Sequence, residues 1–181
     1  MIVCVCREAT ENDLPDIHKI SEKLDVTNRA QLDNGFLVSG YSPADLRRFY
    51  DHSEASILVA DVDGVVVGYL TAYTPGYDSG RPGSVSDGII ESNLWQLENP
   101  TTIKQVGVLP GFQRKGVASE LFDAFMADQH GHVFATIVND PPNPASEALH
   151  SKYGFCPFQS SVSQSTVNSN LFKSTLWCRD P

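Results

Sequence analysis

The segment with the clearest chemical potential is the glycine-containing turn LPGFQRKGVAS at residues 109–119. It follows an apolar, β-branched run that ends at Val108 and precedes a helical pattern of apolar residues that begins near Gly116. The first N–H groups of a helix have no partner inside it and lie at the positive end of its dipole, so they can donate to phosphate oxygens. The turn therefore predicts a binding site for an anionic ligand.

The residues that follow the glycines exclude two phosphate-binding motifs. Gly111 and Gly116 have the spacing of a Walker loop, but that motif continues with Lys and Ser or Thr. This chain continues with Val117 and Ala118 instead. The dinucleotide fingerprint is excluded as well, because the chain contains no Gly-x-Gly-x-x-Gly.

A different pattern matches the turn. Gln113, Gly116 and Ala118 form Gln-x-x-Gly-x-Ala, and Val108 and Pro110 precede it as Val-x-Pro. In these residues the chain resembles the GCN5-related N-acetyltransferase (GNAT) superfamily, whose pyrophosphate-binding signature is Gln/Arg-x-x-Gly-x-Gly/Ala on a strand-to-helix turn. Residues 106–110 look like the strand that precedes this signature in the family.

A second segment supports the same resemblance. It is similar to the family's Asn-x-x-Ala-x-x-Leu-Tyr-x-x-x-Gly-Phe, and the similarity is carried by Asn143, Ala145, Ala148, Leu149, Gly154 and Phe155. The resemblance implies an α+β fold with a central, mostly antiparallel sheet of about seven strands, splayed between the fourth and fifth strands and flanked by about four helices. We expect residues 1–181 to form a single acyl-CoA N-acyltransferase domain.

The resemblance also implies where acetyl-CoA (coenzyme A) would bind as cosubstrate, and it implies no metal. The pantetheine arm would pair with the backbone of the strand before the turn, and the pyrophosphate would bind the N–H groups of residues 114–119. Arg114 and Lys115 either add electrostatic attraction or are solvated surface residues. Asn143 is a helix cap, a pantetheine contact or both. The implied cofactor-binding residues are Val106, Gly107, Val108, Gln113, Arg114, Lys115, Gly116, Val117, Ala118, Ser119 and Asn143.

The catalytic residues depart from the family pattern. The tyrosine that commonly protonates the leaving thiolate in the family is replaced by His150. Histidine can donate a proton at least as readily, because its unperturbed pKa of ~6.5 is closer to neutral pH than the ~10 of tyrosine. His150 is therefore either the acid or a packed histidine, with Tyr153 or water as the alternative donor. As general base we consider three carboxylates before the central strand, Glu98, Glu91 and Asp78.

Ordinary local signals predict the elements that must position these residues. Thr10 and Asp13 form a capping box before an apolar helical pattern, and Ser42-Pro43 starts a second helix. Asp63-Gly64 predicts a tight hairpin turn. Further helices start at Gly116 and after Asn143-Pro144. The expected strands are residues 2–6, 56–60, 65–73, 102–109 and 133–138, with two more between 155 and 179; residues 76–88 are expected to form a long loop, and residues 89–97 are left unassigned.

The composition of the chain argues against nucleic-acid and membrane partners. The chain has 13 Lys+Arg against 22 Asp+Glu and a formal net charge of −9, so a nucleic-acid partner is not expected. No apolar run approaches the ~20 residues that span a bilayer, and the N-terminus lacks a signal-peptide pattern, so we expect a cytoplasmic protein without a membrane partner.

The four cysteines form no Cys-x-x-Cys pair and are expected to be buried, reduced thiols. The sequence is compatible with a homodimer as well as with a monomer.

Together these features predict an N-acetyltransferase that transfers an acetyl group from acetyl-CoA to a primary amine of a small molecule or peptide. The amine would attack directly within a ternary complex. An acidic surface around the site would favour a cationic amine. The alternative is a catalytically inactive CoA-binding or sensing protein on the same fold, with a thioester hydrolase as a weaker third reading.

Overall fold

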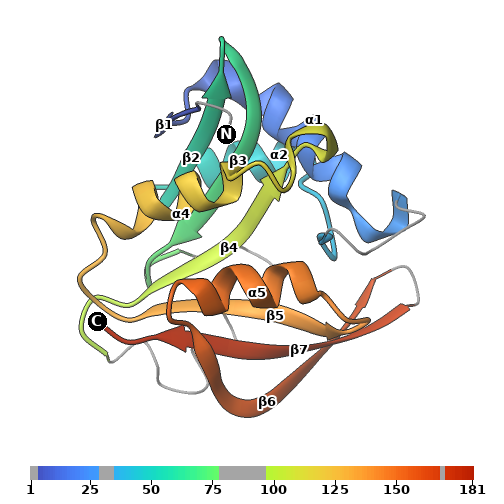
Figure 1. Ribbon diagram of the computed structural model, residues 1–181, viewed down its shortest axis with the longest axis vertical. Helices are drawn as coiled ribbons and strands as arrows, with labels where there is room; N and C mark the ends of the chain where they lie inside the picture. Colours follow the sequence, from blue (N-terminus) through green and yellow to red (C-terminus); the bar gives the residue numbers. More distant parts are fainter. Residues whose placement is uncertain (1–3, 29–34, 78–96, 168–169) are drawn as a thin grey trace.

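A single sheet organises the computed structural model, which describes residues 4–28, 35–77, 97–167 and 170–181. Its seven strands lie in the order β1-β2-β3-β4-β5-β7-β6 (Figure 1). All neighbouring pairs are antiparallel except β4 and β5, which are parallel. The strands are β1 (Val5–Glu8), β2 (Ala55–Val62), β3 (Val65–Tyr73), β4 (Thr101–Val108), β5 (Val133–Asp140), β6 (Cys156–Val167) and β7 (Asn170–Arg179).

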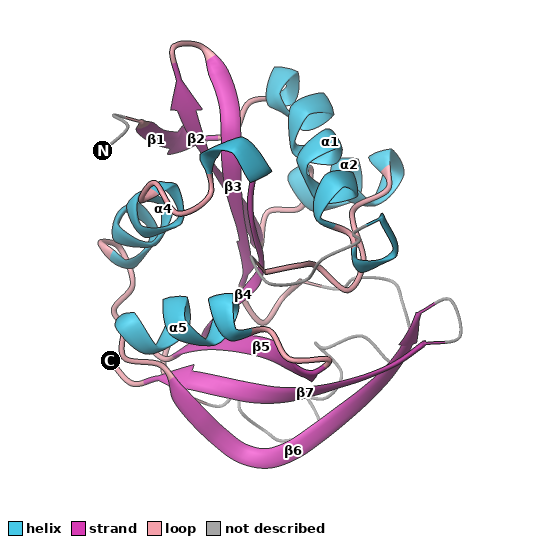
Figure 2. Ribbon diagram, turned by 45° about the vertical axis from the view of Figure 1, so that its right-hand side comes forward, coloured by secondary structure: helices cyan, strands magenta, loops and turns pink. Residues whose placement is uncertain are grey.

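Helices cover both faces of the sheet (Figure 2). On one face, α1 and α2 bury a cluster that includes Ile17, Phe49 and Tyr69. On the other face, α4 and α5 pack on a cluster that includes Phe122 and Phe155. The helices are α1 (Leu14–Leu24), α2 (Pro43–Tyr50), α4 (Val117–Met126) and α5 (Pro144–Lys152), with short 3-10 turns η1 (Glu11–Asp13), η2 (Val26–Asn28) and η4 (Pro110–Phe112).

The predicted helix starts are confirmed by their caps. Ser42 Oγ accepts from Asp45 N at 3.1 Å at the start of α2. Thr10 N donates to Asp13 Oδ2 at 2.7 Å, which completes the capping box before α1. Asp13 also receives two hydrogen bonds from Arg7, and this guanidinium is the main reason that the pKa of Asp13 is lowered to about 2. Through Arg7 the cap at Asp13 is attached to the edge strand β1, whereas the Ser42 cap is local to α2.

The predicted hairpin turn is also confirmed. Asp63 and Gly64 both have positive φ, at 53° and 82°, as a type I′ turn between β2 and β3 requires. Gly64 N donates to Asp61 Oδ1 at 2.7 Å. The turn aligns β2 with β3, and β3 in turn aligns the central strand β4.

The sheet splays between β4 and β5, as the resemblance implies. These strands pair only where Thr101–Ile103 face Val133–Ala135. Beyond this point β5 continues along β7, while β4 continues along β3, whose register shifts between Thr71 and Ala72. The two halves of the sheet therefore share one short junction, which we call the paired end of β4 (Figure 1).

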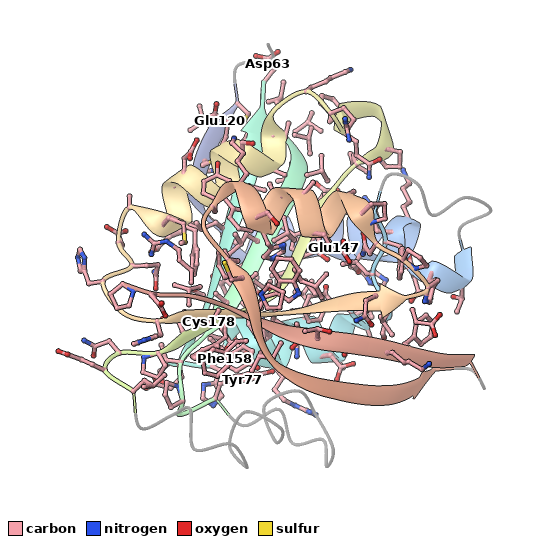
Figure 3. The ribbon with its side chains drawn as sticks, turned by 60° about the horizontal axis from the view of Figure 1, so that its bottom comes forward. Asp63, Tyr77, Glu120, Glu147, Phe158 and Cys178 are labelled. Atoms are coloured by element: carbon pink, nitrogen blue, oxygen red, sulfur yellow. The ribbon has the colours of Figure 1, made fainter. Side chains whose placement is uncertain are left out.

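Several sequence-based expectations need correction. The first strand begins at Val5 and extends to Glu8, because it pairs with β2 along residues 5–8. Cys156 is exposed rather than buried, because it opens the edge strand β6. Cys4 and Cys6 are half-buried, whereas Cys178 is buried beside Phe158 (Figure 3). Residues 78–96 lie outside the described residues. They include most of the loop expected at residues 76–88 and the candidate general bases Asp78 and Glu91.

Candidate active site

The edge of β4 that faces the opening carries backbone groups without a strand partner. On its other edge, Val106 and Val108 pair with Leu70 and Gly68 of β3. On the β5 side, no strand within the described ranges pairs with β4 beyond Ile103. An extended ligand can therefore hydrogen-bond to this edge in the way that an added strand would.

Gly107 lets the centre of this strand pack closely against its neighbours. A Cβ atom at Gly107 would lie 2.6 Å from Tyr69 Cε1 and 3.1 Å from Leu24 Cδ1. Only glycine leaves room for the buried Tyr69 ring at this position. The glycine thus serves the packing of β4 against α1 and β3.

The turn after β4 exposes a series of backbone donors. Gln113 Nε2 donates to Val108 O at 3.1 Å and fixes the turn to the end of β4. Arg114 and Gly116 then adopt left-handed backbone conformations, with φ of 62° and 95°. In the described part of the chain no backbone acceptor pairs with the N–H groups of residues 114–116, and the first helical bond of α4 is donated by Glu120 N. The N–H groups of residues 114–119 are thus available to an anion.

The side chains of the turn add positive charge beside these donors. Arg114 and Lys115 are both exposed, and Lys115 Nζ donates to Gly111 O at 2.7 Å. Val117 is buried in the core, so only its backbone could serve a ligand. Ala118 and Ser119 are half-buried at the start of α4. The arrangement fits a pyrophosphate group, which carries negative charge and many acceptor oxygens.

Asn143 caps α5 and also contacts the loop after α1. It is 5% exposed, and its Oδ1 accepts from Ser146 N at 3.3 Å. Its Nδ2 donates to Phe36 O at 3.3 Å. The predicted role as a helix cap is confirmed. A pantetheine contact would use the remaining N–H of the amide and stays a prediction.

His150 is buried between α5, α4 and the start of β6. It is 6% exposed, and its ring lies edge-on to Phe122 and Phe155, with centroid distances of 5.2 Å to each. Its Nδ1 lies 2.8 Å from Ser146 O. Because a carbonyl oxygen only accepts, Nδ1 carries the proton and Nε2 of the neutral ring is an acceptor. Burial lowers the pKa of His150, which disfavours the imidazolium that an acid would need. These are the surroundings of a packed histidine, and the acid role stays a prediction.

Tyr153 lies near the turn but its hydroxyl already has partners. The hydroxyl lies 2.8 Å from both Ser119 O and Asp123 Oδ1. Burial, together with the hydrogen bond to Asp123, raises the pKa of Tyr153 to about 12. The phenol joins the end of α5 to α4, and its catalytic role also stays a prediction.

Glu98 is not brought together with these residues. It is exposed and directly precedes the paired end of β4, where a Cβ at Gly131 would lie 2.6 Å from Glu98 O. The turn at residues 109–119 follows the opposite end of the strand, roughly 25 Å away at about 3.3 Å per residue. Because the implied pantetheine arm would run from this turn along β4 toward the paired end, the distance to the turn does not decide the role of Glu98, which stays a prediction.

A polar network on β4 escaped the sequence reasoning. Tyr69, which is fully buried, donates its hydroxyl hydrogen to Gln105 Oε1 at 2.8 Å. Gln105 Nε2 donates to Ser39 O at 2.8 Å. The sequence signal for these hydrogen bonds was an amide side chain, Gln105, within the strand expected at residues 102–109.

A comparison with protein families decides the classification. The family described as "Acetyltransferase (GNAT) family" matches residues 26–155. The chain belongs to the GNAT acetyltransferase family. The match includes the open edge of β4, the turn and all of α5, and so contains the whole candidate site.

Solved GNAT structures share the fold over almost the full chain. The ribosomal-protein-S18-alanine N-acetyltransferase from Escherichia coli has a TM-score of 0.69 at 12% identity, with 98% of this chain and 94% of that chain covered. An N-acetyltransferase from Staphylococcus aureus Mu50 has a TM-score of 0.67 at 17% identity, with 98% of each chain covered. Arabidopsis thaliana NAA60 in complex with acetyl-CoA has a TM-score of 0.66 at 14% identity, with 98% of each chain covered. At these identities the similarity shows the GNAT fold alone.

The comparison with curated proteins found no match. Within residues 4–28, 35–77, 97–167 and 170–181, no group of three or more His, Cys, Asp or Glu residues is arranged to hold a metal ion. None of the helices in the same ranges has the length and hydropathy of a membrane span.

Proposed function

We propose that this GNAT protein is an acetyl-CoA-dependent N-acetyltransferase that acts on a primary amine of a small molecule or peptide. One observation carries the proposal: the open edge of β4 leads directly into a turn with free N–H groups at residues 114–119. A ligand that combines an extended amide-containing arm with a pyrophosphate would use both features at once. Coenzyme A has this combination, and the chain from 1 to 181 would act as one catalytic domain.

The residues of the chain would bind and orient the cosubstrate. Val106–Val108 would hydrogen-bond the pantetheine arm, and the start of α4 would hold the pyrophosphate, with Arg114 and Lys115 adding attraction. When bound, acetyl-CoA supplies an activated acetyl group that the neutral amine of the acceptor attacks directly. The negative charge of −9 over the chain favours the approach of a cationic amine.

Proton transfer in this proposal has two candidate donors. His150 and Tyr153 both lie on or directly after α5, and each is held by hydrogen bonds to the chain. In the neutral ring Nδ1 donates to Ser146 O and Nε2 carries no proton, so His150 could donate only after Nε2 is protonated, which burial disfavours. Water is a further route for protons, and Glu98 stays the candidate general base.

The proposed function is tested by binding and turnover together. Isothermal titration should detect acetyl-CoA binding, and thiol release should be measured over a panel of polyamines, aminoglycosides, amino acids and peptide N-termini. If acetyl-CoA does not bind at concentrations on the order of hundreds of micromolar, the proposal is rejected.

A matched pair of glycine variants makes the binding test specific. Gly116→Ala should weaken acetyl-CoA binding, because φ of 95° strains any residue with a Cβ and shifts the turn. Gly111→Ala is the control, because a Cβ there meets no atom within 4 Å and its φ is not positive. Equal binding by both variants would contradict the role of the turn.

A second candidate function is a coenzyme A-binding protein without catalysis. The buried, neutral surroundings of His150, which replaces the tyrosine of the family pattern, favour this alternative. Tight binding of coenzyme A with no thiol release from any acceptor in the panel would support it over the enzyme.

A further inference from the structure

Two cysteines lie directly opposite each other on the last two strands of the sheet. Cys156 is the first residue of β6, and its partner across the antiparallel ladder is Cys178 of β7. The next pair along the ladder is Pro157 with Trp177. Figure 1 shows β6 as the outermost strand, beside β7. The fold therefore brings together two thiols that are far apart in the sequence.

The two side chains lie on the same face of the sheet. Residues directly opposite each other across a ladder point to the same side, with their Cβ atoms about 4.5–5.5 Å apart. On this side Cys178 packs with Phe134 and Phe158 (Figure 3). Burial is the main reason that the pKa of Cys178 is raised to about 12, followed by Asp180 and then by the charge of a Cys156 thiolate. The effect of Cys156 on this pKa agrees with sulfur atoms that lie near each other.

The backbone spacing at this pair suits a disulfide bond. Disulfides join residues whose Cα atoms lie about 4.4–6.8 Å apart. Opposed residues of an antiparallel ladder have Cα atoms about 5.5 Å apart where they exchange hydrogen bonds and about 4.5 Å apart where they do not. Both spacings fall within the range of a disulfide. Cys4 and Cys6 are less suited, because residues two apart along an extended chain are separated by roughly 6.6 Å, near the upper limit.

The start of β6 has room to adjust when a bond forms. Only the pairs of Cys156 and Pro157 hold it to β7 before the register shifts between Pro157 and Val162. Gly154, just before the strand, has a positive φ of 82°. A disulfide needs a dihedral angle near 90° between its sulfur atoms, and this short piece of ladder can shift to allow it. Any strain that remains would make the bond easier to reduce, and hence reversible.

The two thiols differ in their access to solvent. Cys156 is exposed on the edge strand, whereas Cys178 is 6% exposed. A small disulfide in solution can therefore reach Cys156 first. Cys178 can then react with a sulfur that is already attached to Cys156. This difference gives Cys156 the role of the attacking thiol and Cys178 the role of the resolving thiol.

We propose that Cys156 and Cys178 form a redox modification site, at which glutathione disulfide converts the two thiols into a reversible cross-strand disulfide. The thiolate of Cys156 attacks one sulfur of glutathione disulfide, forms a mixed disulfide and releases one glutathione thiolate. Cys178 then loses its proton and attacks the Cys156 sulfur, and the second glutathione leaves as a thiolate. The cysteine pair loses two electrons, and glutathione disulfide is reduced to two glutathione molecules.

Peptide mass spectrometry of the full chain tests this site. The native protein is equilibrated with glutathione and glutathione disulfide at about pH 8, where exposed thiols are partly ionised, then quenched with acid and digested without reduction. A peptide pair that joins Cys156 to Cys178 should appear, and added glutathione should return it to thiols. Cys178→Ala should instead keep a glutathione adduct on Cys156, and Cys156→Ser should form neither product.

Cys6→Ser is the matched control, because it removes a half-buried thiol outside this pair and should leave the cross-link unchanged. The same oxidation in urea shows which links form when the strands are not paired. A stable glutathione adduct on Cys156 without the cross-link, a link between two chains through Cys156, or a cross-link that forms only in urea would overturn the proposal. The experiment needs neither acetyl-CoA nor turnover, so its result is independent of the proposed function.

Discussion

The hydroxyl of Tyr153 lies 2.8 Å from Asp123 Oδ1, and this contact joins the end of α5 to the middle of α4. The same hydroxyl lies 2.8 Å from Ser119 O. Two elements of the candidate site, the helix after the turn and the helix with Asn143 and His150, are thus attached through one phenol. Its protonation state should matter for the stability of the fold.

Tyr153→Phe should lower the free energy of unfolding by about 1 kcal/mol at neutral pH, because one hydrogen bond is lost. The folded pKa of Tyr153 is raised from 10.0 to about 12, first by burial and then by Asp123. A raised pKa stabilises the fold below the unfolded pKa, and this stabilisation is lost as pH rises through the folded value. Urea denaturation of both proteins should show the difference shrinking between these two pKa values. A difference that does not depend on pH would contradict this role.

The lowered pKa of His150 predicts a pH effect of the opposite sign. A buried histidine whose folded pKa lies below the unfolded value stabilises the fold above about 6.5, and this contribution is lost as pH falls toward the folded value. His150→Phe should remove this part of the acid sensitivity, since Phe suits a site beside Phe122 and Phe155. The exposed His130→Phe is the control. An unchanged pH–rate profile in His150→Phe would further identify His150 as a packed residue.

Gly107→Ala should destabilise the protein by about 1–3 kcal/mol, the usual cost of overpacking a core. The added Cβ would lie 2.6 Å from the Tyr69 ring, which cannot move without disturbing its hydrogen bond to Gln105. Thermal unfolding measures the effect, with Gly111→Ala as the unstrained control. Equal stability of the two variants would show that the Tyr69 ring has room to adjust.

Cys156 should react with iodoacetamide well before the other three cysteines. It is exposed, whereas burial raises the pKa of Cys6 and of Cys178 to about 12 and also raises that of Cys4. The thiolate is the reacting species, so a raised pKa slows alkylation at about pH 8. Peptide mass spectrometry should find the first label on Cys156, and Cys156→Ser should remove this fast phase. If Cys178 is labelled first instead, the result would contradict the burial of Cys178 on β7 and the exposure of Cys156 on β6.

Local signals predicted the elements well, because their causes lie within a few residues. The Ser42 cap and the Asp63-Gly64 turn each follow from short-range chemistry, and the structure confirms them. The splay of the sheet came from the family resemblance. It does not follow from periodicity, because β4 and β5 have ordinary strand patterns.

Contacts between distant segments could not be predicted in the same way. The bond from Asn143 to Phe36 O joins residues 107 positions apart, and no local pattern marks either partner. The role of Glu98 as general base rests only on its position before the central strand, and it stays a prediction. The burial of His150 depends on which side of α5 packs on Phe122, and the weak amphipathic pattern of that helix did not decide this.

The three residue pairs between Thr101–Ile103 and Val133–Ala135 have a mechanical consequence. So short a junction leaves the two halves of the sheet joined chiefly by the side-chain cluster under α4 and α5, which contains residues of β2, β3, β4 and β5. A ligand arm that hydrogen-bonds along β4 while contacting α5 would add backbone-level bonds to this connection and strengthen the coupling between the halves. The affinity for the ligand and the cooperativity of unfolding would then depend on the same hydrogen bonds along β4.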